Sequence, residues 1–101
     1  IGDSFYKIPS SEFLISNDFT NDLESGDSIA SESTSAVDTS TGDAATNDII
    51  ESTVVEDDKV FVGVMGGTAG VDYRVSIKAT STNGYKYQKD ILLRIHNESH
   101  F

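Results

Sequence analysis

Hydrophobic side chains recur at every second position in three runs between residues 60 and 95. The runs comprise Val60, Val62 and Val64, then Tyr73, Val75, Ile77 and Ala79, then Ile91, Leu93 and Ile95. Alternation with a period of two places one face of a β-strand on a core and the other face in water. The pattern therefore predicts three strands in this part of the chain.

Two turn signals separate these strands. Gly66, Gly67 and Gly70 bracket the first connection, and Asn83-Gly84 marks the second as a hairpin. Glycine and asparagine tolerate the positive φ angles that tight turns require. We therefore assign these five residues structural roles in strand connections.

The first half of the chain carries weaker strand signals. Residues 12–19 predict a strand with Phe13 and Ile15 on one face and Leu14 as an outlier, and the loop over residues 17–27 contains Phe19 and Leu23 as anchors into the core. Residues 27–37 predict a polar strand that leads into a Ser/Thr-rich linker, with local disorder of this segment as the alternative. Residues 48–55 predict an apolar strand. Six or seven short strands with turns between them indicate an all-β antiparallel sandwich.

One residue favours an immunoglobulin-like sandwich in particular. In that fold a tyrosine near the start of the penultimate strand folds back and hydrogen-bonds the preceding corner. Tyr73 follows the glycine-rich connection at this position. We therefore expect an immunoglobulin-like sandwich of about seven strands over residues 12–95, an N-terminal arm over residues 1–11 that is ordered against a partner, and a C-terminal tail over residues 96–101.

The charge of the chain is strongly uneven. The net charge is −10, yet residues 1–58 carry fourteen acids and one base, whereas residues 59–101 carry three acids and six bases. This balance argues against nucleic acid and anionic membranes as partners, because both require clustered basic residues. Cysteine is absent, which excludes disulfides and thiolate chemistry.

Four of the six basic residues in the second half fall on one predicted face. Arg74, Lys78, Lys86 and Arg94 occupy positions that point away from the core. A basic face opposite acidic strands favours oriented packing against neighbouring subunits. The alternative is that these bases form cross-strand pairs, for example with Asp90, and only stabilise the sheet. A second candidate interface is the apolar cluster of the arm, which contains Phe5, Tyr6 and Ile8.

No motif predicts catalysis or a cofactor. His96 and His100 lie in the tail without an adjacent nucleophile, and no hydrolase, P-loop or zinc-protease spacing occurs. Calcium is the strongest chemical alternative, because hard cations prefer clustered oxygen ligands. The candidate ligands are Asp18, Asp22, Glu24 and Asp27, with Glu56-Asp57-Asp58 as a second cluster. Asn97-Glu98-Ser99 satisfies the N-glycosylation pattern.

Several segments resemble small immunoglobulin-like proteins encoded among the structural genes of tailed bacteriophages. The resemblance covers roughly residues 12–95. It lies in the G-D-S-I segment from Gly26, the K-V-F-V strand from Lys59, the G-G-T-A-G-V-D-Y corner from Gly66, and the final hairpin ending in D-I-L-L-R-I from Asp90. The acidic Ser/Thr stretch 31–47 and the arm 1–11 depart from it.

The resemblance implies a non-enzymatic virion protein. We expect a head decoration, tail or fibre-attachment module whose partners are capsid, tail or fibre proteins and further copies of itself. The alternative is a secreted or cell-surface adhesive domain that binds calcium or glycan through the acidic loops.

Overall fold

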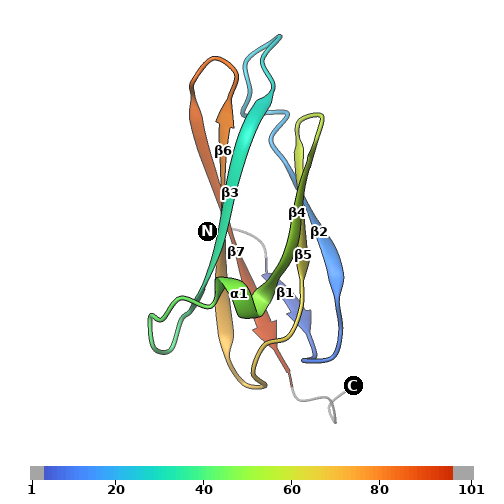
Figure 1. Cartoon of the computed structure of the whole chain (residues 1–101), viewed down its shortest axis with the longest axis vertical. Helices are drawn as coiled ribbons and strands as arrows, with labels where there is room; N and C mark the ends of the chain where they lie inside the picture. Colours follow the sequence, from blue (N-terminus) through green and yellow to red (C-terminus); the bar gives the residue numbers. More distant parts are fainter. Residues whose placement is uncertain (1–3, 97–101) are drawn as a thin grey trace.

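The chain forms two β-sheets packed face to face (Figure 1). The structure is a computed structural model that describes residues 4–96. Its elements are β1 (Ser4–Lys7), β2 (Phe13–Asp18), β3 (Ile29–Asp38), α1 (Thr46–Ile49), β4 (Ile50–Glu56), β5 (Lys59–Val64), β6 (Asp72–Ser81) and β7 (Lys86–Ile95). The predicted all-β sandwich is confirmed.

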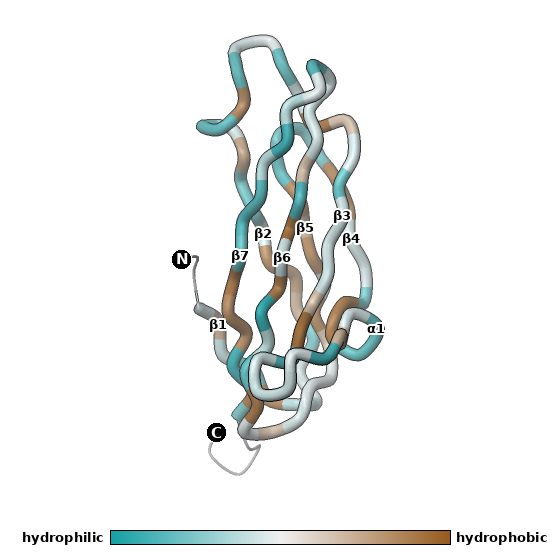
Figure 2. Tube along the Cα trace, turned by 90° about the vertical axis from the view of Figure 1, so that its left-hand side faces the viewer, coloured by the Kyte–Doolittle hydropathy of each residue, from teal (hydrophilic) through white to brown (hydrophobic). Residues whose placement is uncertain are grey.

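The two sheets differ in width. One contains four strands in the order β1-β7-β6-β3, which follow one another from left to right in Figure 2, and the other contains three strands in the order β2-β5-β4. β1 runs parallel to β7, whereas the other paired strands are antiparallel. The sandwich is elongated, with extents of 47 × 25 × 22 Å.

The alternating apolar positions face each other across the two sheets. Val60, Val62 and Val64 of β5 are fully buried, and the corresponding side chains of β6 and β7 are at most 5% exposed. Phe19 and Ile49 complete this core from the connections, each with 0% exposure. Complete burial of a side chain of this size stabilises the folded chain by about 1.5–3 kcal/mol relative to leaving it exposed. The alternating apolar residues of the second half therefore supply much of the fold's stability.

The N-terminal segment differs from the expected arm. Ser4–Lys7 forms β1 and pairs with β7 of the same chain, so this segment is ordered without a partner. Alternation along β1 turns Phe5 toward the core and Tyr6 outward, with Tyr6 55% exposed. Ile8 follows the strand and is partly buried. Of the predicted apolar cluster, Tyr6 is thus the member most open to a partner.

The predicted strand over residues 48–55 begins later than expected. Residues 46–49 form the single turn α1, and β4 starts at Ile50. The amide of Ile49 donates to the carbonyl of Ala45 at 3.1 Å, and the turn places the Ile49 side chain in the core. A helical turn allows Ile49 to be buried while the backbone changes direction into β4.

The glycine-rich connection lies at the lower end of the sandwich in Figure 1, beneath the start of β6. Tyr73 is 5% exposed, and its hydroxyl accepts a hydrogen bond from the Thr68 amide at 3.1 Å. Gly67 has φ +95° and packs against Ile95. At the upper end, Gly84 has φ +91° in the turn between β6 and β7. Across residues 4–96, no helix is long and apolar enough to span a membrane.

Candidate interaction surfaces

The outer face of the four-stranded sheet is polar and basic. Cross-strand partners share a face, so the register assigns its members. They are Ser4 and Tyr6 of β1, Ser31, Ser33, Ser35 and Val37 of β3, Asp72, Arg74, Ser76, Lys78 and Thr80 of β6, and Lys86, Gln88, Asp90, Leu92 and Arg94 of β7. The four bases expected to point outward therefore lie on one exposed face.

In the lower half of this face, acidic side chains lie beside the basic ones and balance their charge. Arg94 forms an ion pair with Asp72 at 3.9 Å, and both side chains are more than one-third exposed. A hydrogen bond from Gln88 lowers the pKa of Asp90, and the positive charge of Arg74 acts in the same direction. The cross-strand pairing that the sequence left as an alternative therefore applies to this half.

The upper half of the face, nearest the β6–β7 turn, retains its positive charge. Within residues 4–96, neither Lys78 nor Lys86 forms an ion pair. The two lysines lie on neighbouring strands, because Lys78 is opposite Gln88 and Lys86 is opposite Thr80. Among residues 4–96, these two lysines therefore form a positive patch without an ion-paired acid, in a chain whose net charge is −10.

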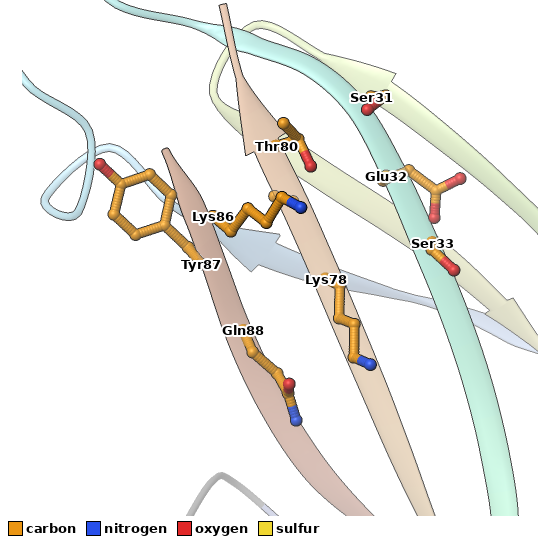
Figure 3. A pocket seen from close by; sticks show the side chains of 9 residues that line it. Ser31, Glu32, Ser33, Lys78, Thr80, Lys86, Tyr87 and Gln88 are labelled. Carbon is orange, nitrogen blue, oxygen red and sulfur yellow. The ribbon is translucent and has the colours of Figure 1, made fainter. Parts of the chain in front are cut away.

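A shallow concavity of about 400 Å³ occupies this upper half (Figure 3). Figure 3 shows Lys78, Lys86 and Thr80 on β6 and β7, with Ser31, Glu32 and Ser33 on β3 beside them and the three-stranded sheet behind. The carboxylate of Glu32 accepts hydrogen bonds from the hydroxyls of Thr34 and Thr53. Ammonium and hydroxyl groups together are hydrogen-bond donors suited to carboxylates. The concavity is thus equipped to receive a negatively charged group.

The outer face of the three-stranded sheet is apolar at its centre. Leu14 is 65% exposed and Val54 is 52% exposed, and the register places both on the outer side with Phe61 and Gly63 of β5. A Cβ atom on Gly63 would lie 2.8 Å from the Ser52 hydroxyl oxygen and 3.5 Å from a methyl carbon of Leu14. Neighbouring side chains therefore close over Gly63, and Leu14, Phe61 and Val54 form an apolar strip.

The rim of this strip is acidic. At its upper end Asp18, Lys59 and Glu56 lie side by side across β2, β5 and β4. Glu51 is exposed at the bulge near the lower end of β4. The two outer faces of the sandwich thus differ in kind, one basic and rich in hydroxyls, the other apolar with an acidic rim.

A comparison with protein families identifies the family of the chain. The family model described as podophage GP4 fiber-tail adaptor protein gp77 matches residues 7–94. The chain belongs to this family. No curated protein matches the chain.

Membership in the fibre-tail adaptor family makes the chain a virion component of a tailed phage. This confirms the resemblance and the virion location, and it supports a structural role in the tail. A structural adaptor is not an enzyme class, and the partners of such an adaptor lie among tail and fibre proteins. Of the particle positions that the sequence left open, the family points to the tail.

Three of the four acidic residues proposed as calcium ligands in this adaptor, Asp18, Asp22 and Asp27, are engaged separately. Asp18 accepts hydrogen bonds from Thr20, which hold the pKa of Asp18 below its ordinary value. Asp22 pairs with Lys89 at 3.3 Å. Across residues 4–96, no three acidic or histidine side chains gather in an arrangement that could hold a metal ion.

Asp27, the fourth proposed ligand, joins two loops. Its carboxylate is almost buried and accepts hydrogen bonds from the Thr82 hydroxyl and from the amides of Ser28 and Asn83. The Thr82 hydroxyl contributes most to the lowered pKa of Asp27. Asp27 thus ties the β2–β3 loop to the β6–β7 turn, a role that sequence spacing did not reveal.

The two histidines of the predicted tail differ in what the structure describes. The amide of His96 donates to the carbonyl of Lys7 at 2.8 Å, and the His96 ring lies 4.9 Å from that of Tyr6. His96 therefore continues the contact between β1 and the end of β7. His100 and the glycosylation pattern at residues 97–99 lie outside the described residues.

Sequence reasoning did not find the apolar strip. Leu14 was the one signal, because it breaks the alternation of residues 13–19. At the start of β4 and within it, the adjacent pairs Ile49-Ile50 and Val54-Val55 hide which side faces the core. The register with β5 is needed to place Val54 outside.

Proposed function

We propose that this chain joins components of a phage tail as an immunoglobulin-like adaptor that docks them on its two outer sheet faces. The observation that carries the proposal is the chemical difference between the basic face and the apolar strip. An adaptor needs at least two distinct docking surfaces, and a rigid sandwich holds such surfaces at a fixed relative orientation.

Strand order supports the immunoglobulin-like part of the proposal. The order β2-β5-β4 corresponds to strands B-E-D of that fold, and β3-β6-β7 corresponds to C-F-G. Tyr73 lies near the start of the penultimate strand and accepts the hydrogen bond of Thr68. β1 then extends the C-F-G sheet by pairing in parallel with β7.

The two faces are suited to different tasks in docking. Exposed Leu14 and Val54 are large apolar side chains whose burial by a partner supplies affinity. The acidic rim selects a partner surface with an apolar centre and basic surroundings, because like charges across an interface are unfavourable. Charged side chains on the opposite face orient a second partner more than they strengthen its binding.

The test replaces Leu14→Asp and Val54→Asp together in the full chain. Both side chains are more than half exposed, so the variant is expected to keep its melting temperature while losing attachment to tail or fibre protein. The measurement is the amount of adaptor and fibre that sediments with particles assembled in the presence of each variant.

Thr41→Asp is the matched control, because it adds charge at an exposed residue of the β3–α1 loop far from the strip. The control is expected to sediment with particles at the native level. Native levels of adaptor and fibre for the Leu14/Val54 variant would overturn the docking role of the strip.

A further inference from the structure

We propose that the concavity between Lys78 and Lys86 receives the acidic β4–β5 turn, Glu56-Asp57-Asp58, of a second copy of this chain. The inference rests on the adaptor function above, since it names the partner of the basic face. The basic face then joins adaptors to one another, and the apolar strip joins them to a tail or fibre component.

The receiving surface presents cations at a spacing that suits two carboxylates. Lys78 and Lys86 are diagonal neighbours on adjacent antiparallel strands, which places them roughly 7–8 Å apart at the backbone. Ser31, Ser33 and Thr80 line the same concavity and add hydroxyl donors. Because no ion pair within residues 4–96 engages the two lysines, they are available for an external anion.

The β4–β5 turn has the complementary properties. It joins two antiparallel strands through Asp57 and Asp58, and Glu56 directly precedes them. Glu56 and Asp57 are exposed, and no ion pair engages any of the three acids within residues 4–96. The carbonyl of Asp58 accepts the amide of Phe19 at 2.9 Å, which fixes the turn to the core. The turn is therefore a rigid acidic projection.

The dimensions of the two features agree. The concavity spans β7, β6 and β3, which are three adjacent strands and so cover about 10 Å. A two-stranded turn is about 5 Å wide at the backbone, and side chains on both sides fill the remaining width. One turn therefore fits across the concavity with its carboxylates beside the lysines.

The turn and the concavity cannot meet within one molecule. The turn ends the three-stranded sheet, whereas the concavity lies on the far side of the four-stranded sheet (Figures 1 and 3). The contact is therefore intermolecular and joins two different surfaces. Such a heterologous contact generates a ring if its rotation closes and an open chain if it does not. A turn in a shallow concavity buries little area, so each single contact is weak and gains strength from repetition.

The net charge of the chain predicts how its self-association depends on salt concentration. At low ionic strength, molecules of charge −10 repel one another over about 30 Å. Near physiological salt the screening length is about 8 Å, which suppresses this repulsion but preserves ion pairs in direct contact, whereas about 1 M salt weakens the pairs as well. Self-association is therefore expected to be strongest at intermediate ionic strength.

The test exchanges the charges of the two surfaces in the full chain and measures self-association by sedimentation velocity at increasing protein concentration. One variant carries Lys78→Glu and Lys86→Glu, and the other carries Glu56→Lys and Asp58→Lys. Asp57 is left unchanged because its φ of +55° favours aspartate over lysine. Each variant alone is expected to associate about tenfold or more weakly than the native chain. A mixture of the two is expected to recover association, because each acidic turn again meets lysines and each basic turn meets glutamates.

Matched controls separate the contact from the change in net charge. Arg74→Glu with Arg94→Glu alters the same face in its lower half, and Asp43→Lys with Asp48→Lys alters exposed acids near α1. Both controls are expected to associate more strongly than the variant with the same net charge. Equal effects of control and test variants, or failure of the mixture to recover association, would overturn the proposal.

The same measurements distinguish this proposal from the adaptor function. A native chain that stays monomeric at every salt concentration overturns the contact between copies. If the Lys78/Lys86 variant at the same time loses a tail or fibre protein, an acidic partner occupies the concavity and the adaptor function stands. The function itself fails only through the Leu14/Val54 variant, which leaves Lys78, Lys86 and the three acids of the turn unchanged.

Discussion

The ammonium nitrogen of Lys7 lies 2.6 Å from the carbonyl oxygen of Gly66, 59 residues away in the sequence. It lies equally close to the carbonyl of Ile8 and 3.3 Å from that of Pro9. Lys7 is 2% exposed and is the one base among residues 1–58. Burying a charge is unfavourable unless it is hydrogen-bonded. Backbone carbonyls meet that requirement and fasten β1 to the connection between β5 and β6.

Replacing Lys7→Met is expected to lower the free energy of unfolding by about 2 kcal/mol, because hydrogen bonds to a charged group are lost and carbonyls are left unpaired. Urea denaturation measures the change. Lys59→Met serves as the control, since Lys59 is exposed. Equal stability of the two variants would show that Lys7 contributes nothing beyond a surface lysine.

Alanine substitutions at Gly67 and Gly70 separate the cost of a steric clash from the cost of backbone strain. Both have positive φ angles, +95° and +86°, so alanine introduces similar strain at each. A Cβ atom at Gly67 would lie 2.8 Å from two carbons of Ile95, whereas nothing lies within 4 Å at Gly70. Gly70→Ala is expected to cost about 1–2 kcal/mol, and Gly67→Ala about 1–3 kcal/mol more. Thermal unfolding of both variants measures the two losses of stability. A larger loss for Gly70→Ala than for Gly67→Ala would contradict the prediction.

The hydroxyl of Tyr73 is expected to contribute to stability through the Thr68 amide. Tyr73→Phe keeps the buried ring and removes the hydrogen bond, so the expected loss is about 1 kcal/mol. For a domain of this size such a loss lowers the melting temperature by roughly 4–8 °C. Tyr85→Phe, at a half-exposed ring, is expected to leave the melting temperature unchanged. Calorimetry on the two variants decides whether the corner hydroxyl matters.

Acid is expected to weaken the link that Asp27 makes between the β2–β3 loop and the β6–β7 turn. Its pKa is lowered in the folded chain, mainly by the Thr82 hydroxyl. As pH falls below the unfolded value of about 3.9, the unfolded chain takes up the proton first, so the free energy of unfolding decreases until the folded pKa is passed. Stability at neutral pH therefore includes a contribution that disappears in this range.

Asp27→Asn removes that titration and should flatten the loss of stability between pH 5 and pH 2, a range of roughly three units around the ordinary aspartate pKa. Asp43→Asn is the control, because Asp43 is exposed. Urea unfolding across this range measures both slopes. An unchanged slope for the Asp27 variant would show that other carboxylates carry the acid dependence.

The local pattern of apolar and polar residues was informative where one face of a strand is buried and the other is exposed to solvent. β5, β6 and β7 were predicted correctly because Val62, Ile77 and Leu93 belong to unbroken alternations. Polar β3 was predicted at nearly its observed length, since its two apolar ends bracket a run of serine and threonine. The pattern failed at Ile49-Ile50, where two adjacent apolar residues fit a helical turn as well as a strand.

The candidate surfaces were only partly predictable. Arg74, Lys78, Lys86 and Arg94 share a face because a period of two fixes their side relative to the core. Their pairing was not predictable, because Asp72 lies opposite Arg94 only through the register of β6 and β7. Separating paired bases from unpaired ones therefore required the fold.

Alternation is a local property of each strand, and it was sufficient to predict a β-sandwich with a basic outer side. The pairing of strands depends on contacts between distant segments. This pairing determines the burial of Lys7, the separate engagement of the loop aspartates and the apolar strip around Leu14. These features arise from residues up to 59 positions apart, and contacts over such distances depend on sheet order and register, which no local pattern specifies.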